Sequence, residues 1–403
     1  MRVRKGALLL ALYFCQGLPG GFLAVALPVM MREQGASFTI VGFAAWLNLP
    51  WVIKFLWAPL ADRIPALRFG RRKIWILPAQ LGMILVTLAF AFVIPETELL
   101  WIAVGFLLLN FLAATQDIGV DGLAVDSLSK RELGAGNTTQ VSGFKLGNIV
   151  GGGVLLSLAA TIGWRGDFLI MALAVAATAV FLLFTRETSL YAEDRSDSPP
   201  ATLRDLFAGL KAAGLGLWLF LFYAKFAETF GGALVKPVLV DHGFARGMIG
   251  LLDGTIGGIA TVAGGVAAGL VYWKIGLRTT FVLFTLVQGL FLILFGLATI
   301  GEISFGLAAT LNGIENFAGG ATGVCALALA MAACPSRVGA GMFTLFQCIY
   351  TAGAFAGNPL SGVCADQVGP LAVFAAGGVM TLSLAPILLW TRLSQKAAGT
   401  ALI

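Results

Sequence analysis

The sequence predicts an all-α membrane protein with about twelve transmembrane helices. Of its 403 residues, 59% are hydrophobic and only 11% are charged. Soluble proteins carry about one quarter charged residues, so we expect a chain this poor in charge to be solvated by lipid rather than by water. Its 52 glycines suit helices that pack closely without a hydrophobic driving force between them.

Apolar segments long enough to cross a bilayer recur along the whole chain. Each spanning helix needs about 20 apolar residues. We place twelve such helices at residues 6–31, 37–61, 72–94, 98–128, 138–162, 166–186, 213–240, 247–272, 278–299, 302–332, 338–364 and 370–391. The first follows three basic residues, as a secretory signal would, but its apolar run is longer than a signal core and many spans follow. We therefore expect an uncleaved first helix.

Lysines and arginines concentrate in alternate loops. Nineteen of the 26 fall on one side of the predicted membrane and only three, Arg32, Arg165 and Arg246, on the other. Cytoplasmic loops carry such an excess, so we expect both termini in the cytoplasm and the chain in a bacterial inner membrane. The net charge of +6 is then a topology signal, and no nucleic-acid partner is expected.

The chain divides near its middle. The longest polar stretch, residues 187–212, follows the sixth span and is interpreted as a cytoplasmic linker. It separates an N-terminal bundle of six helices, residues 1–186, from a C-terminal bundle of six helices, residues 213–403.

Two short similarities relate these halves. LPVMMREQG at 27–35 resembles KPVLVDHG at 236–243, and DSLSKRELGAG at 126–136 resembles MAACPSRVGAG at 331–341. Because both fall at equivalent helices and in the same order, they indicate parallel repeats. That arrangement predicts a solute cavity between the halves, near the middle of the membrane.

Ionisable residues inside the first-half spans are functional candidates, because an unpaired charge in hydrocarbon is costly. Asp117 and Asp121 are four residues apart and share a helix face, and we predict both as proton-coupling residues. At a rise of about 1.5 Å per residue, Lys54, Asp121 and Lys145 lie at similar depths, where pairing would offset desolvation. We expect Asp117, about one turn deeper, to be less fully compensated. Asp126 lies near the interface and suits a structural or gating role. Structural ion pairing remains the alternative for the whole set.

The second half carries its own intramembrane charges. Lys225 and Glu228 lie one turn apart on the seventh span, and Glu315 lies on the tenth, near Asn312 and Asn316. We predict Glu228 and Glu315 as further proton-coupling residues. Lys225 and Glu315 both fall near the middle of the membrane, so Lys225 could pair with Glu315 or hold an anionic solute.

Polar side chains inside the spans are the predicted solute-binding residues. They are Gln16, Lys54, Gln116, Lys145, Lys225, Asn312 and Asn316.

The loop after the second span reads DRIPALRFGRR at 62–72. Acids and bases in a short loop can latch neighbouring helices through ion pairs that break on opening. The predicted gating residues are Asp62, Arg63, Gly70, Arg71 and Arg72. Ordinary inside-positive charge explains the arginines but not the acid.

Several classes of protein are disfavoured. The five cysteines form no C-x-x-C pair and the chain has one histidine, so no metal site and no cofactor are expected. There is no G-x-x-x-x-G-K-[ST] loop for ATP, and no H-E-x-x-H or G-x-S-x-G motif. An intramembrane aspartyl protease would need acids converging from two helices, whereas Asp117 and Asp121 share one. We expect no enzyme, and no attached domain indicates a sensor.

Four motifs carry a resemblance to a known family. They are QGLPGGF at 16–22, KFLWAPLADR at 54–63, GRRKIW at 70–75 and ATQDIGVDGLAVD at 114–126. Together they resemble the AmpG-like permeases, and the 62–72 loop looks like a degenerate signature loop of the major facilitator superfamily. The resemblance implies a twelve-helix facilitator fold and import driven by a proton gradient. It marks Lys54, Asp62, Gln116, Asp117 and Asp121, and its sharp motifs all lie in the first half.

We therefore predict a proton-coupled importer of a medium-sized solute, monomeric and with the solute, protons and the lipid bilayer as partners. Typical muropeptide permeases of the family are longer, which favours its siderophore branch and a siderophore or its iron complex as solute. A muropeptide or a coenzyme A thioester remains the alternative.

Overall fold

The computed structural model describes residues 3–57, 70, 72–92, 99–128, 133–185, 214–333 and 339–390. Within these ranges the secondary structure is helical and contains no strand. Nine helices of the described chain are long and apolar enough to cross a membrane. The described parts of the other predicted spans, 37–61, 213–240 and 338–364, are helical too. The prediction of an all-α membrane fold is confirmed.

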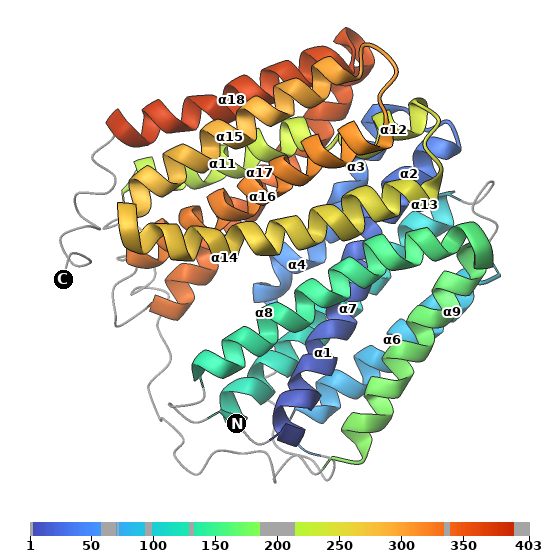
Figure 1. Ribbon diagram of the computed structural model, residues 1–403. Helices are drawn as coiled ribbons and strands as arrows, with labels where there is room; N and C mark the ends of the chain where they lie inside the picture. The colour runs from blue at the N-terminus through green and yellow to red at the C-terminus, as the bar shows by residue number, and fades with distance from the viewer. Residues whose placement is uncertain are drawn as a thin grey trace. The chain divides into compact units, whose positions relative to one another are not determined.

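The described residues form two compact units, each drawn in Figure 1. Unit 1 falls within Met1–Gln34, Trp46–Asp197 and Ala245–Thr255. Its main elements are α1 (Val3–Gly21), η1 (Phe22–Ala26), α2 (Leu27–Glu33), α4 (Leu49–Ile53), η3 (Lys54–Leu56), α6 (Lys73–Phe90), α7 (Leu99–Ser127), α8 (Leu133–Ile149), η4 (Val150–Val154), α9 (Leu155–Leu183) and α13 (Arg246–Ile249).

Unit 2 falls within Gly35–Ala45, Ser198–Phe244 and Ile256–Ile403. Its elements are α3 (Phe38–Phe43), α11 (Leu215–Gly232), α12 (Val235–Asp241), α14 (Gly258–Ile275), α15 (Leu277–Ala298), α16 (Phe305–Ala332), α17 (Gly339–Val368) and α18 (Pro370–Trp390). Two further segments, η2 (Ala44–Asn48) and η6 (Gly250–Gly257), lie where the chain passes between the units.

The units exchange two short segments of sequence. Residues 35–45, from the first half, belong to unit 2, and residues 245–255, from the second half, belong to unit 1. The division into bundles at 1–186 and 213–403 remains a prediction, and the linker 187–212 lies outside the described residues.

The second predicted span is not the single helix that residues 37–61 suggested. Its described part runs through α3, the 3-10 segment η2, α4 and the 3-10 segment η3. Pro50 stands at the start of α4, and because it has no N–H it cannot continue the helical hydrogen bonds of the preceding turn. The fifth and sixth spans separate at Gly163, whose φ of 67° interrupts α9.

Glycines allow α1 and α8 to pack backbone against backbone. A Cβ atom added to Gly147 would lie 2.2 Å from the carbonyl oxygen of Phe14 and 2.8 Å from Cα of Gly17. Three consecutive glycines follow in η4, where the helix widens into a π turn, a feature found often near functional sites. Small residues therefore set the spacing of these helices.

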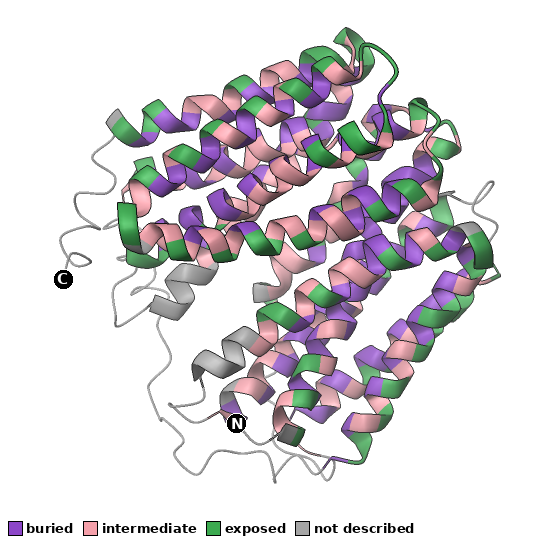
Figure 2. Ribbon diagram, viewed as in Figure 1, coloured by how far each residue is buried: buried purple, intermediate pink, exposed green. Residues whose placement is uncertain are grey.

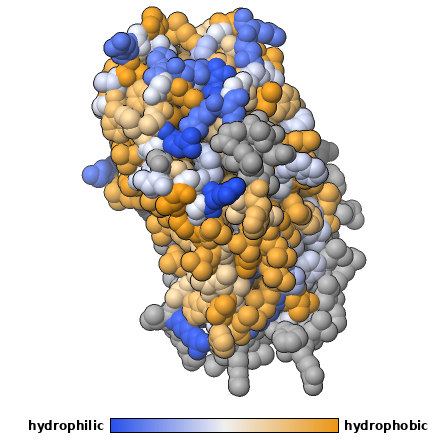
Figure 3. All heavy atoms as spheres, turned by 90° about the vertical axis from the view of Figure 1, so that its right-hand side faces the viewer, coloured by the Kyte–Doolittle hydropathy of each residue, from blue (hydrophilic) through white to orange (hydrophobic). Residues whose placement is uncertain are grey.

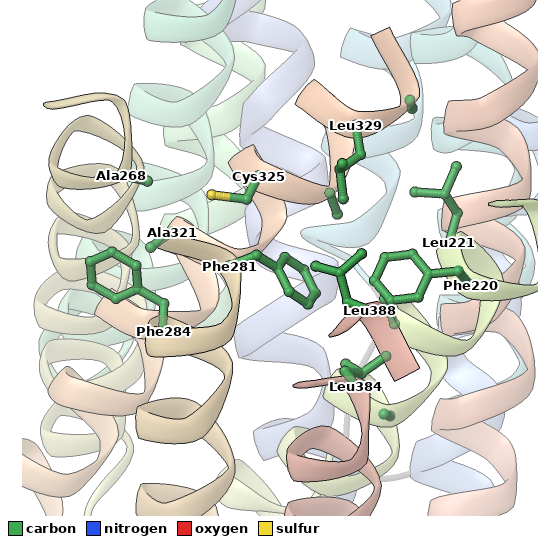
Figure 4. Packing of buried hydrophobic residues seen from close by; sticks show 14 of the residues in the cluster. Phe220, Leu221, Ala268, Phe281, Phe284, Ala321, Cys325, Leu329, Leu384 and Leu388 are labelled. Atoms are coloured by element: carbon green, nitrogen blue, oxygen red, sulfur yellow. The ribbon is translucent and has the colours of Figure 1, made fainter. Parts of the chain in front are cut away.

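Unit 2 has a core of large apolar side chains. Figure 4 shows Phe220 and Leu221 of α11 beside Phe281 of α15 and Leu388 of α18. Outside the cores, large apolar residues remain uncovered: Phe92 and Phe184 are 84% and 79% exposed. Figure 2 shows exposed and buried stripes along the helices, and most of the surface in Figure 3 is apolar. Such exposure fits a lipid solvent.

Asp366, at the end of α17, caps α3 from a distant part of the sequence. Its carboxylate accepts hydrogen bonds from the backbone N–H groups of Phe38 at 3.1 Å and Thr39 at 2.9 Å. Desolvation raises the pKa of Asp366, but the hydrogen bonds from the α3 end, led by Thr39, outweigh it and hold the pKa below its ordinary value. The ionised form is therefore the one that binds α3.

The α1–α8 contact predicts unequal effects of one substitution at two glycines. Gly147→Ala should destabilise the protein by about 1–3 kcal/mol, because its Cβ meets backbone that cannot yield cheaply. Gly269→Ala in α14, where nothing lies within 4 Å, should be neutral or stabilise by up to about 1 kcal/mol. Thermal unfolding in one detergent compares them, and equal midpoints would contradict the close packing.

The α3 cap predicts a pH-dependent contribution to stability. Because the folded-state pKa of Asp366 is lowered, its contribution should be complete above the ordinary value of about 3.9 and disappear as pH falls through the lowered pKa. The difference in unfolding temperature between the wild type and Asp366→Asn should therefore shrink toward acid pH. The exposed Glu302→Gln serves as control, and a difference independent of pH would show that the carboxylate is not the cap.

Candidate functional site

The first acid of α7, Asp117, is paired with a lysine from the interrupted second span. Asp117 is 6% exposed, and its carboxylate forms an ion pair with Lys54 of η3. The Lys54 ammonium also lies 5.3 Å from the ring centroid of Trp51, whose Nε1 donates to Asn110 Oδ1 at 2.9 Å. The expectation that Asp117 would be less fully compensated is wrong, because Lys54 reaches this acid.

The second acid, Asp121, receives hydrogen bonds from neutral groups. Its Oδ1 accepts from the Tyr13 hydroxyl of α1 at 2.8 Å and from Gln140 Nε2 of α8 at 3.2 Å. The carboxyls of Asp117 and Asp121 also lie close enough to interact, and the charge of Lys54 acts on both. Two acids therefore share one lysine in this cluster.

The third acid, Asp126, holds the start of α6. Its Oδ2 lies 2.8 Å from Nε of Arg72, and the two side chains are 5% and 6% exposed. The guanidinium lies against Gly122, where an added Cβ would come within 2.4 Å of its Cζ. The predicted gating residue Arg72 thus has a buried partner on α7.

Of the other gating candidates, the structure describes Gly70. Gly70 adopts a φ of 104°, a region that favours glycine. Asp62, Arg63 and Arg71 lie outside the described residues.

In unit 2, Lys225 pairs with Glu228 one turn along α11. The Nζ–Oε1 distance is 2.5 Å, and the two side chains are 25% and 26% exposed. The hydroxyl of Tyr350 on α17 donates to Glu228 Oε2 at 3.3 Å, and Lys225 Nζ lies 5.4 Å from the Tyr350 ring centroid. The suggested pairing of Lys225 with Glu315 is replaced by this three-residue cluster.

Glu315 of α16 is buried beside amide and hydroxyl groups. Its Oε1 accepts from Gln288 Nε2 of α15 at 3.1 Å, and Gln288 Oε1 accepts from Thr322 at 2.9 Å. The nearby Asn316 donates to Asn312 Oδ1 at 3.1 Å and accepts from Thr261 Oγ1 of α14 at 3.3 Å. The predicted polar residues of α16 thus face two different helices.

The predicted glutamines lie inside unit 1. Gln16 and Gln116 are completely buried. Gln116 Nε2 donates to the carbonyl of Leu12 at 3.3 Å, and the amide of Gln16 has no hydrogen-bond partner among the described residues. Lys145 is half-buried on α8. In this structure the side chains of Gln16 and Gln116 are therefore enclosed within unit 1, while Lys54 and Lys225 keep about a quarter of their side-chain surface exposed.

The sequence analysis did not single out the neutral side chains that contact these charges or support those that do. They are Tyr13, Trp51, Asn110, Gln140, Gln288, Thr322 and Tyr350. Each is a side chain with a polar group inside a predicted span, and this is the pattern in the sequence that could have identified it. The described residues contain no group of three or more His, Cys, Asp or Glu side chains that could hold a metal ion.

Solved structures identify the fold. A POT-family transporter crystallised in meso superposes with a TM-score of 0.75, covers 99% of both chains and is 11% identical. A bacterial homologue of the lysosomal transporter Spinster, solved in an inward-facing state, gives a TM-score of 0.69 at 15% identity, over 99% of this chain and 96% of that one. At these identities the likeness shows the fold, a multi-pass helical membrane fold of the major facilitator type.

Sequence relatives narrow the class to a family. The chain is 30% identical over 363 residues to the anhydromuropeptide permease of Escherichia coli K12, covering 89% of this chain and 74% of that protein. A family model described as acetyl-coenzyme A transporter 1 matches residues 6–162. The chain belongs to the AmpG-like permease family.

The predicted preference for a siderophore finds no support in these comparisons. They fit the muropeptide alternative better. The preference depended on chain length, and length does not report on the residues that contact a solute.

We predict that the protein loses stability when either residue of the Arg72–Asp126 pair is replaced alone. Arg72→Gln or Asp126→Asn alone should cost about 3–5 kcal/mol, because each leaves one charge buried without its partner. The double substitution should recover most of this loss. A double-mutant cycle of unfolding temperatures measures it, with the exposed Arg165→Gln as control. Additive losses would show that the two side chains do not stabilise each other.

Proposed function

We propose that this protein is a proton-coupled importer of an anhydromuropeptide in the bacterial inner membrane, with both termini in the cytoplasm. The relative in Escherichia coli carries the solute assignment, since the alignment spans most of both chains. The cluster of Asp117, Asp121 and Lys54 supports the coupling.

Charge balance makes this cluster a proton site. One lysine can neutralise one of its two carboxylates, and the groups that donate to Asp121 are a neutral phenol and a neutral amide. Removing a second negative charge from water without a cation is costly. Like charges at close range favour protonation of one of them. The pair therefore holds one proton when Lys54 faces Asp117, and releases it when water reaches Asp121.

Lys225 provides the contact for an anionic solute. Its ammonium is partly exposed and bound to Glu228. If Glu228 accepts a proton, Lys225 becomes available to a carboxylate of a peptide, and Tyr350 keeps both side chains in place through its hydroxyl and its ring face. Proton binding and solute binding would then be linked through one ion pair.

Uptake by purified protein in liposomes tests the solute. An imposed pH gradient should drive accumulation of a labelled anhydromuropeptide, and unlabelled muropeptide should compete better than acetyl-coenzyme A or a ferric siderophore. Accumulation of either competitor in place of the muropeptide would overturn the solute assignment.

Asp121→Asn tests the proton site. Accumulation driven by the pH gradient should fall about tenfold or more, whereas exchange of solute across the membrane without a gradient should persist, because the amide keeps the contacts to Tyr13 and Gln140. Glu302→Gln, an exposed acid, is the matched control. Full dependence on the gradient in Asp121→Asn would remove Asp121 from the coupling mechanism.

A further inference from the structure

Unit 1 includes a short segment that is covalently joined to unit 2 at both ends. This segment, residues 245–255, begins with α13, which packs against α9. A Cβ on Gly250 would lie 2.8 Å from the carbonyl oxygen of Gly153, so backbone meets backbone there. Ser157 Oγ donates to the Gly247 carbonyl at 3.2 Å. The segment is therefore docked on unit 1 by close packing as well as by hydrogen bonding.

Arg246 adds a charged contact at the start of the segment. Its Nε lies 3.2 Å from Glu33 Oε1 and its Nη2 lies 3.1 Å from Glu33 Oε2. Its Cζ lies 5.2 Å from the ring centroid of Trp164. A guanidinium binds best to a carboxylate in bidentate geometry and to the face of an aromatic ring.

A second carboxyl lies beside this contact. Asp167 follows Trp164 by three residues on α9 and is completely buried. Neither of its oxygens has a hydrogen-bond partner among the described residues. The next residue, Phe168, packs its ring against Phe22 and Phe90, and Arg246 is a charge that acts on Asp167. The proton and solute sites described above do not use this acid.

We propose that Asp167 is a second carboxylate partner for Arg246, called the second seat below. The guanidinium leaves Glu33 and binds Asp167 when the 245–255 segment shifts. The inference rests on the proposed function, since transport is what requires a segment anchored in unit 2 to move on unit 1. The two carboxylates differ in their exposure to water. Glu33 is 26% exposed and can return to water, whereas the buried Asp167 depends on a cation.

Trp164 contacts Arg246 and lies on the same helix as Asp167. Its ring supports the guanidinium beside Glu33, and Asp167 follows one turn later on the same helix. Unit 2 holds the reciprocal segment 35–45 through Asp366, so each unit docks a short piece of chain that continues into the other.

The alkylation rate of a cysteine at position 157 tests the exchange. Ser157→Cys is introduced after the five native cysteines are replaced, and both faces of membrane vesicles are exposed to a thiol reagent. Arg246→Gln should raise the alkylation rate about tenfold, the effect of losing a charged hydrogen bond. Glu33→Gln alone should raise it less than about threefold, because Asp167 takes over the guanidinium.

Combining Glu33→Gln with Asp167→Asn should reproduce the full effect of Arg246→Gln. Arg165→Gln, which removes an exposed arginine one residue after Trp164, should change nothing. Gel filtration confirms that each variant is folded. If Glu33→Gln already matches Arg246→Gln, or if adding Asp167→Asn has no further effect, Asp167 is not a second seat.

A disulfide separates this inference from the proposed function. Alkylation requires no solute, so its outcome stands even if no muropeptide uptake is found. In a protein that does transport, oxidising Ser157→Cys with Gly247→Cys should abolish uptake, and a reductant should restore it. Unchanged uptake by the cross-linked protein would show that the segment does not shift.

Discussion

Compensation of charge in an apolar environment is the constraint on which this structure depends. On α7, three acids are held by other parts of unit 1: Lys54 of η3 binds Asp117, Tyr13 of α1 and Gln140 of α8 bind Asp121, and Arg72, which precedes α6, binds Asp126. An acid without these partners would be expelled from hydrocarbon. The same contacts therefore hold the helices together and form the proposed proton site.

Close backbone packing makes such contacts possible. Where glycines line α1, α8 and η4, the helices approach until backbone touches backbone. Tyr13 of α1 and Gln140 of α8, from the two helices joined in this way, both donate to Asp121. Interruptions of regular helix do the same for the second span, since the 3-10 turn of η3 carries Lys54 to Asp117. In the second span, the departure from regular helix thus brings a charged residue to its partner.

The sequence predicted the all-α membrane fold and where its apolar helices lie, because hydropathy reports directly on lipid exposure. It did not predict the partners. Depth along a helix was calculated for an unbroken rise, and Pro50 breaks the second span, so Lys54 reaches Asp117. The sequence also did not show which neighbouring helix each polar side chain faces, because the few polar residues of α7 and α16 stand among apolar ones and do not orient either helix against its neighbours. Hence Gln288 was missed as the partner of Glu315, and Lys225 was considered as a partner of Glu315 when it binds Glu228.

The exchanged segments have a consequence for how the protein can be divided. A fragment ending before the 187–212 linker would keep 35–45 but lose the α17 surface on which it docks, and a fragment starting after the linker would carry 245–255 without α9. Each half alone would expose the glycine-lined surface on which the missing segment docks. Produced together as separate polypeptides, the halves should assemble by trading these pieces, as in fragment complementation, and the linker itself would be dispensable for assembly.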